Sequence, residues 1–336
     1  MARDDGALIT RLLSTPLEDL LAEARARRDA RIGPGTPARM TYSAKVFIPL
    51  TRLCTDVCHY CTFATTPSRL EAPYMSEEEV LEVARAGATA GCKEALFTLG
   101  DAPERRYDAA REWLADHGFA RTIDYVRHCA ELVLKETGLL PHVNAGILEE
   151  EDYRMLRPVA ASVGLMLEST SERLLEKGMC HHGSPDKVPA VRLASLAAAG
   201  RARVPTTSGV LIGIGETPEE RIEALLALRD LHEAHGHLQE VIVQNFCPKP
   251  GTKMSGAAEA GEADFLRTIA AARIVLPDAV SVQTPPNLND ERLAELIDAG
   301  IDDWGGISPV TLDHVNPEAP WPEVERLEAI CARVGL

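Results

Sequence analysis

The sequence lacks any long hydrophobic run and any excess of basic residues. No apolar stretch approaches the roughly 20 residues that a membrane-spanning helix needs, and the opening MARDDGALIT is charged where a secretory signal is hydrophobic. Lysines and arginines number 35 against 51 aspartates and glutamates, for a net charge of -16. Such a surface repels nucleic acid and anionic membranes. We therefore expect a soluble cytoplasmic protein that has neither as a partner.

The 336 residues also lack a Gly-, Ser- or Pro-rich linker that would divide the chain. After a charged helical start, short β-rich runs alternate with Ala-, Leu- and Glu-rich stretches of helical period, which indicates a parallel sheet. Eight repeats over about 290 residues fit a closed (β/α)8 barrel of TIM type better than an open sheet. We expect a helical extension over 1–40 and one α/β barrel domain over 41–336. The expected strands are 45–53, 94–100, 141–147, 162–170, 203–213, 240–246, 280–286 and 302–308.

Local signals define two of the expected helices. Ser76 is a typical N-cap for a helix that ends near Gly91, and Thr217 is a typical N-cap for the helix that follows it. Polar or unusual residues gather where the expected strands end, and in a parallel barrel those ends form the mouth of the active site. They are Cys54, Asp101, Asn144, Glu168, Gly213, Asn245, Asn287 and Ser308.

The eight cysteines do not form a disulfide framework. Three of them, Cys54, Cys58 and Cys61, form a CxxxCxxC motif in the loop after the first expected strand, whereas the other five are scattered and read as small apolar core residues. Clustered thiols in a cytosolic protein indicate metal or redox chemistry. Three thiolates on a four-iron cluster leave one iron without a protein ligand, so that it can bind substrate or cofactor.

Zinc is the alternative for this loop. Structural zinc sites take four ligands, usually from two paired CxxC or CxxH elements, and the sequence has no second pair. His59 or the His181-His182 pair could supply a fourth ligand. A zinc-stabilised barrel that binds a ligand without catalysis therefore stays open as a second class of function.

The motif CxxxCxYC, with Tyr60 before the last cysteine, resembles that of the radical S-adenosylmethionine (SAM) superfamily. The resemblance implies that the three cysteines hold a 4Fe-4S cluster whose open iron binds the amine and carboxylate of SAM. It also implies that an electron from the cluster breaks a carbon-sulfur bond and releases a deoxyadenosyl radical. The cofactors would then supply the difficult chemistry, and the protein would position them.

Three further elements resemble the cofactor-binding elements of this superfamily. The pair Gly100-Asp101 resembles the glycine-acid element that meets the cofactor amine, although the usual Gly-Gly-Glu is changed here to Leu-Gly-Asp. Glu168 resembles the acid that binds the ribose, and Arg192 resembles the arginine that pairs with the cofactor carboxylate. The third element is the segment 209–216, which fits the pattern GxIxGxxE near the adenine, with its pattern residues at Gly209, Leu211 and Gly213.

The resemblance extends from Lys45 to about Pro317 and is closest to subunit 1 of the 7,8-didemethyl-8-hydroxy-5-deazariboflavin (FO) synthase family. It implies that a tyrosine-derived hydroxybenzyl adduct of ribityl-aminouracil closes to the deazaflavin of coenzyme F-420 with loss of ammonia. Subunit 2 as functional partner and an electron donor such as ferredoxin or flavodoxin follow from it. The segments that carry the resemblance are FIPLTRLC (47–54), YCTFAT (60–65), LPHVNAG (140–146), MLES (166–169), QNFCPKPG (244–251) and PPNL (285–288).

A polar substrate of this kind calls for amides and hydroxyls at the mouth of the barrel. The residues in suitable positions are His142, Asn144, Thr206, Gln244, Asn245, Lys249, Gln283 and Asn287. Other radical SAM activities stay open, namely the partner subunit, a biotin-synthase-like sulfur inserter and a menaquinone-pathway enzyme. No residue is assigned to proton transfer from the sequence.

Overall fold

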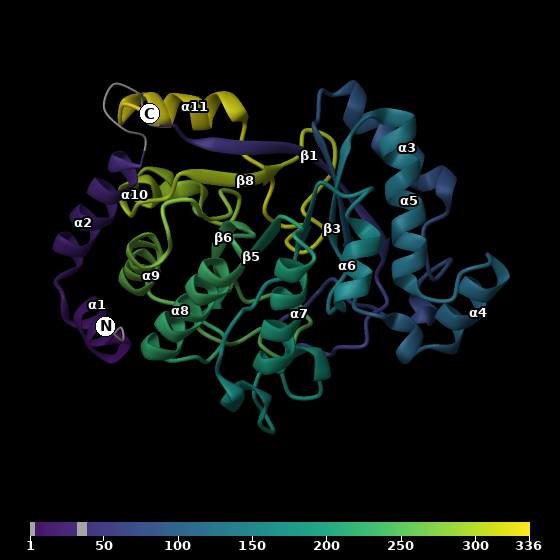
Figure 1. Ribbon diagram of the computed structural model, residues 1–336, viewed down its shortest axis with the longest axis horizontal. Helices are drawn as coiled ribbons and strands as arrows, with labels where there is room; N and C mark the ends of the chain where they lie inside the picture. Colours follow the sequence, from purple (N-terminus) through teal and green to yellow (C-terminus); the bar gives the residue numbers. More distant parts are fainter. Residues whose placement is uncertain (1–3, 32–38) are drawn as a thin grey trace.

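A closed parallel barrel forms the centre of the molecule (Figure 1). The computed structural model describes residues 4–31 and 39–336. In this part of the chain the strands pair in sequence order, and the last strand pairs in parallel with the first. Each strand overlaps one of those expected from the sequence, which confirms the (β/α)8 fold. The strands are β1 Thr41–Thr51, β2 Glu94–Leu99, β3 Leu140–Asn144, β4 Ser162–Gly164, β5 Thr206–Ile212, β6 Leu238–Asn245, β7 Ser281–Gln283 and β8 Asp303–Ile307.

Helices surround the barrel (Figure 1). They are α1 Asp5–Ser14, α2 Leu17–Ala30, α3 Glu77–Thr89, α4 Asp108–Asp116, α5 Thr122–Thr137, α6 Glu150–Leu156, α7 Pro189–Arg201, α8 Pro218–His235, α9 Glu262–Val275, α10 Leu293–Asp298 and α11 Val324–Arg333. Single 3-10 turns lie at Pro67–Arg69, Pro103–Arg105, Glu172–Leu175, Pro185–Lys187 and Asp290–Arg292. None of the helices in residues 4–31 and 39–336 has the length and apolar character to span a membrane.

The starts of α3 and α8 follow the local signals in the sequence. The Ser76 hydroxyl accepts a hydrogen bond from the backbone N–H of Glu79, and the Thr217 hydroxyl accepts one from that of Glu220. Both glutamates reach back to the backbone N–H of the capping residue, so each helix begins with a complete capping box. The predicted starts of these two helices are confirmed.

The hydrophobic core lies between the strands and the surrounding helices, in two large clusters. One joins the outer faces of β1 to β4 with α3, α5 and α6, and includes the fully buried Ile48 and Phe97. The other joins β5 to β8 with α8, α9 and α10, and includes Val241 and Ile269. This burial fixes the strands, and therefore fixes the positions at which the loops leave the carboxyl ends of the strands.

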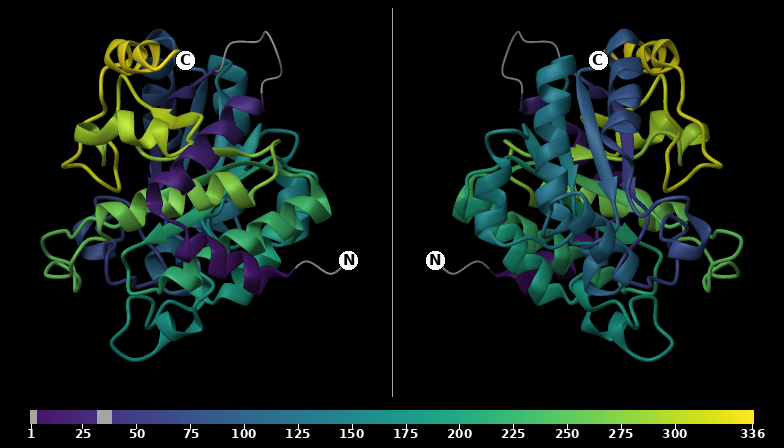
Figure 2. Two further views of the ribbon diagram at one scale, coloured as in Figure 1. Left: turned by 90° about the vertical axis from the view of Figure 1, so that its left-hand side faces the viewer. Right: turned by 90° about the vertical axis from the view of Figure 1, so that its right-hand side faces the viewer.

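The helices α1 and α2 pack against this second cluster, where Leu12, Leu20 and Ala24 are fully buried. Figure 2 shows these helices along the outside of the barrel, and α2 contacts α9 and α10. The proposed domain boundary between residues 40 and 41 stays a prediction. Residues 32–38 of the expected extension lie outside the described part of the chain.

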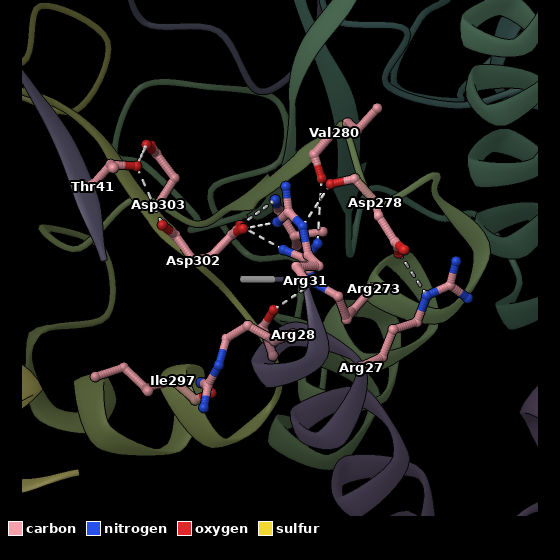
Figure 3. A network of polar contacts seen from close by, with 12 residues as sticks. Arg27, Arg28, Arg31, Thr41, Arg273, Asp278, Val280, Ile297, Asp302 and Asp303 are labelled. Carbon is pink, nitrogen blue, oxygen red and sulfur yellow. Dashed lines mark hydrogen bonds and ion pairs between the residues drawn. The ribbon is translucent and has the colours of Figure 1, made fainter. Parts of the chain in front are cut away.

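Arginines join α2 to the barrel helices (Figure 3). Arg27 donates to the carbonyls of Ile274 and Leu276 at the end of α9, and Arg28 donates to the carbonyl of Ile297 at the end of α10. Carbonyls at the end of a helix have no partner within the helix and carry partial negative charge. The cationic side chains of α2 therefore satisfy groups that the barrel helices leave open.

Candidate active site

The three motif cysteines lie in the loop that follows β1. The first turn of this loop is attached to the end of β2, because the backbone N–H of Asp101 donates to the Cys54 sulfur at 3.3 Å and the N–H of Thr55 donates to the Asp101 carbonyl at 2.9 Å. A Cβ atom on Gly100 would lie 1.9 Å from the Leu53 carbonyl oxygen. Only glycine therefore allows β2 and the cysteine loop to approach this closely.

A segment that follows β4 holds the other side of the cysteine loop. The Ser184 hydroxyl accepts from the backbone N–H of Val57 at 3.0 Å and lies 3.5 Å from the Cys58 sulfur. The backbone N–H of His59 donates to the Cys180 carbonyl at 2.9 Å. Two segments far apart in sequence thus determine the shape of the loop.

Burial governs the chemistry of the thiols. It raises the pKa of Cys54 to about 12 and that of Cys58 to about 11. A cationic centre is then needed to stabilise the thiolates. In residues 4–31 and 39–336, no three His, Cys, Asp or Glu side chains are arranged to hold a single metal ion.

A cavity of about 430 Å³ lies at the carboxyl ends of the strands, beside the cysteine loop. It has the size of a small-molecule site. The predicted site residues that line it are Cys54, Cys58, Cys61, Tyr60, Gly100, Asp101, Glu168, Arg192, Leu211, His142, Asn144, Gln244, Asn245 and Asn287. Gln283 and Lys249 line it as well, whereas Thr206, Gly209 and Gly213 do not.

The glycines of the segment 209–216 are explained by contacts within the protein. A Cβ atom on Gly209 would lie 2.2 Å from the Ile242 carbonyl oxygen on β6, so that this glycine allows β5 and β6 to pair closely. Gly213 has a φ of +91°, which favours glycine. Glu216 accepts from the backbone N–H of Gly213 at 2.8 Å and so closes the turn. A role for these glycines beside an adenine stays a prediction.

Glu168 is the centre of a buried network. Its carboxylate accepts from the Tyr60 hydroxyl at 2.5 Å, lies 3.1 Å from His181 Nε2, and forms ion pairs with Lys187 and, at 3.6 Å, with Arg192. Burial alone would raise the pKa of Glu168, but Lys187, His181 and Arg192 outweigh it and hold that pKa well below its usual range. Glu168 is therefore an anion within the cavity.

The backbone of Glu168 is also unusual. Its φ is +66°, in the left-handed region that non-glycine residues rarely adopt. Its N–H donates to the Gly209 carbonyl and its carbonyl accepts from the N–H of Leu211, so that β5 holds it in this conformation. The ladder of β4 ends at Gly164, before the 170 expected from the sequence, and Glu168 then pairs with Val210 of β5 as an isolated bridge.

Arg192 and Asp101, which line this cavity, each have polar atoms without a partner among the described residues. Nε and Nη1 of the buried Arg192 donate to no group among the described residues, and Oδ1 of the buried Asp101 accepts from none. The other oxygen of Asp101 accepts from the backbone N–H of Ile147 at 2.9 Å. Burial, with the nearby charge of Asp186, raises the pKa of Asp101 to about 7. Unpaired buried groups of this kind are costly, and a ligand would satisfy them.

The predicted substrate residues form a polar wall. His142 lies 2.7 Å from the Ser162 hydroxyl and 2.9 Å from the Asn144 side-chain oxygen. Burial, and then the Lys45 charge, lower the pKa of His142 to about 3, so the imidazole is neutral. Asn287 Nδ2 donates to Asp313 at 3.0 Å, while its side-chain oxygen has no donor among the described residues.

Sequence reasoning missed Lys187 altogether and considered His181 only as a zinc ligand. Both come from the long segment between β4 and α7, whose only regular elements are two short 3-10 turns. The run Ser184-Pro-Asp-Lys187 resembles an ordinary turn, and only its fold against the cysteine loop places the lysine beside Glu168. Nothing in the local sequence indicates that contact.

The model of the radical SAM superfamily matches residues 48–228 of this chain. The chain is 52% identical to the FO synthase of Nocardia farcinica over 340 residues, which are 99% of this chain and 39% of that protein. It is 51% identical to the 7,8-didemethyl-8-hydroxy-5-deazariboflavin synthase of Methanopyrus kandleri over 88% of this chain and 89% of that protein. The chain thus spans about two fifths of the length of the FO synthases that it matches.

Solved structures show the same fold. Methylornithine synthase superposes with a TM-score of 0.73 and 19% identity, over 98% of this chain and 92% of that one. The FeFe-hydrogenase maturase HydG from Carboxydothermus hydrogenoformans superposes with a TM-score of 0.74 and 20% identity, over 99% of this chain and 79% of that one. At these identities, the likeness bears on the fold alone.

The chain belongs to the radical SAM superfamily. Within the superfamily it is a member of the family of the Methanopyrus deazariboflavin synthase. The resemblance drawn from the cysteine motif and the six segments is therefore confirmed. Membership implies an enzyme that uses a 4Fe-4S cluster and SAM.

Proposed function

We propose that this chain closes the deazaflavin ring system of FO in coenzyme F-420 biosynthesis. Its substrate would be the adduct 5-amino-5-(4-hydroxybenzyl)-6-(D-ribitylimino)-5,6-dihydrouracil, and ammonia would leave as the rings join, so that the enzyme is a lyase. The strongest support is the 51% identity to the Methanopyrus synthase over 89% of its length. That match covers 88% of this chain and so extends far beyond the cysteine loop.

We assign Cys54, Cys58 and Cys61 as the three protein ligands of the 4Fe-4S cluster, which leaves one iron open for SAM. Support comes from their shared loop at one end of the cavity and from the absence of a competing disulfide among them. When bound, these cofactors supply a deoxyadenosyl radical that takes a hydrogen atom from the substrate. The remaining residues of the cavity would bind and orient the cofactor and the substrate. They would also exclude water.

The unpaired groups of the cavity fit the amino-acid end of SAM. The open edge of the Arg192 guanidinium suits a carboxylate, and the free oxygen of Asp101 suits an ammonium group. Glu168 would accept from the ribose hydroxyls while Tyr60 holds its carboxylate in place. Gly100 keeps the cysteine loop close to these groups, and Leu211 adds apolar surface for the adenine.

We assign the uracil edge, the ribityl chain and the phenol of the substrate to the polar wall of the cavity. A neutral His142 and the amide groups of Asn144, Gln244, Asn245 and Asn287 can donate to and accept from such groups without adding charge. The adduct would come from the subunit 2 activity of FO synthase. A small electron carrier such as ferredoxin or flavodoxin would reduce the cluster.

The test is reconstitution of the protein with iron and sulfide in the absence of oxygen, followed by incubation with SAM, a reductant and the adduct. We expect 5′-deoxyadenosine by chromatography and deazaflavin by its fluorescence, both of which should require the adduct and the three cysteines. Cleavage of SAM without deazaflavin would leave the superfamily in place and refute the proposed reaction. A colourless protein with one zinc per chain would refute the cluster assignment.

A further inference from the structure

A layer of polar side chains crosses the inside of the barrel near the amino ends of its strands. Barrels of this architecture usually fill their interior with branched apolar side chains. Here the layer consists of Lys45 on β1, Glu94 on β2, His142 on β3, Thr207 on β5, Glu240 on β6 and Asp303 on β8. Burying so many polar groups costs stability unless they are paired. The layer therefore calls for a functional explanation.

This layer separates two cavities. The active-site cavity reaches down from the carboxyl ends of the strands, and a second cavity of about 370 Å³, the floor cavity, lies at the amino ends. Thr41, Glu94, Ser281 and Asp303 are among the residues that line the floor cavity. Among the described residues, Glu240 alone lines both cavities. Glu240 therefore connects the active-site cavity with the opposite end of the barrel.

The charges of the layer are not evenly paired. Lys45 Nζ lies 3.0 Å from the Glu94 carboxylate, so that Glu94 has a cationic partner. Within the described residues, no lysine or arginine forms an ion pair with Glu240 or Asp303. Their partners are neutral: Glu240 accepts from the Thr207 hydroxyl at 3.1 Å, and Asp303 accepts from the Thr41 hydroxyl and from a backbone N–H.

Glu240 and Asp303 both line the floor cavity, and two carboxylates facing one cavity make each other harder to deprotonate. Burial, and then the Glu240 charge, raise the pKa of Asp303 to about 7. Lys45 acts in the opposite direction but is already paired with Glu94, and His142 is neutral. A carboxylate poised near neutral pH both accepts and releases a proton readily.

We propose that Glu240 and Asp303 carry a proton from the active-site cavity to the floor cavity as the deazaflavin forms, an inference that rests on the proposed function. In the step, a C–H or N–H bond of the cyclised substrate breaks, its electron pair stays with the substrate, and an O–H bond forms on Glu240. The proton passes to Asp303 and then to solvent in the floor cavity. The relay moves one proton and no electrons. The cofactor and the substrate would fill the mouth of the active site. The relay would give the proton a second route to solvent, at the opposite end of the barrel.

The test compares the reconstituted wild type with Glu240→Gln and Asp303→Asn, which keep the shape of each side chain and remove the transferable proton. We measure the ratio of deazaflavin to 5′-deoxyadenosine, and we expect it to fall at least about tenfold in both variants. The matched control is Glu131→Gln, the same change at an exposed acid on α5 that lines neither cavity, and its ratio should stay within twofold of wild type. Circular dichroism checks the fold.

The pH profile separates a relay from a structural role. A base must be deprotonated to act, so wild-type deazaflavin formation should rise with pH through a pKa near 7, and Asp303→Asn should abolish this limb. Wild-type ratios and an unchanged profile in both variants would overturn the relay while the proposed function stands. Absence of deazaflavin from the wild type would overturn the proposed function and this inference together.

Discussion

Replacement of Arg192 by methionine should weaken SAM binding strongly while leaving the fold intact. Arg192 is buried, its Nη2 lies 3.6 Å from Glu168, and its Nε and Nη1 have no partner among the described residues. A hydrogen bond to a charged group contributes about 1.5 to 3 kcal/mol. Two such bonds to the cofactor carboxylate would contribute about 3 to 6 kcal/mol, and we expect at least a ~100-fold rise in Kd.

The free energy of unfolding of the cofactor-free protein should change by less than about 1 kcal/mol in this variant, because the loss of one ion pair is offset by removal of two unsatisfied buried donors. Anaerobic titration calorimetry of SAM measures the first quantity, and urea unfolding measures the second. The matched control is Arg201→Met on the same helix, where the side chain is half exposed and pairs with Glu150 outside the cavity. A rise in Kd of less than threefold for Arg192→Met would refute the assignment of this residue.

Three further changes test the site and the fold. Cys58→Ala should lose the iron and the visible absorbance of the reconstituted protein, whereas Cys247→Ala, a cavity cysteine outside the motif, should keep both; iron retained in Cys58→Ala would contradict the ligand assignment. Gly100→Ala should lower the free energy of unfolding by about 1 to 3 kcal/mol and impair cluster loading, because its Cβ would lie 1.9 Å from a backbone oxygen; urea unfolding and iron content measure both effects. Arg273→Met should lower the free energy of unfolding by about 3 to 5 kcal/mol, because the carbonyls of Gly300 and Val280 lose this donor and Asp302 keeps only Arg31 and the Val282 N–H as partners. The exposed Arg25→Met should cost less than about 1 kcal/mol, and equal losses in the two arginine variants would show that burial does not decide the effect.

The parts of the structure that depend on neighbours in sequence could be predicted. Ser76 and Thr217 define their helices through contacts three residues away, so the sequence alone is sufficient. The loop position of Cys54 follows from the end of the first hydrophobic strand. The order of strands and helices then determines the barrel, because parallel strands require crossover connections.

The parts that depend on distant residues could not be predicted. Lys187 meets Glu168 only because the segment after β4 folds back over the cysteine loop. The close approach of Gly209 to the β6 backbone depends on how two strands pair, and the sequence of the segment does not show it. The acids Glu240 and Asp303 lie in separate strands, and the pairing of β6, β7 and β8 brings them to one end of the barrel. Each of these contacts arises from tertiary packing, which cannot be predicted from a short stretch of sequence.

The contacts of Ser184 and Cys180 with the cysteine loop also bear on the order in which the protein folds during synthesis. The loop around Cys58 is complete only when Ser184 has been synthesised and has folded against it. Barrel closure comes later still, because β1 pairs with β8 across some 260 positions of the chain, from Thr41 to Asp303. On a ribosome the three thiols emerge long before the residues that shelter them. If these thiols hold the cluster, we expect its insertion to follow synthesis of the whole barrel, and a prematurely released fragment would expose the thiols to oxidation.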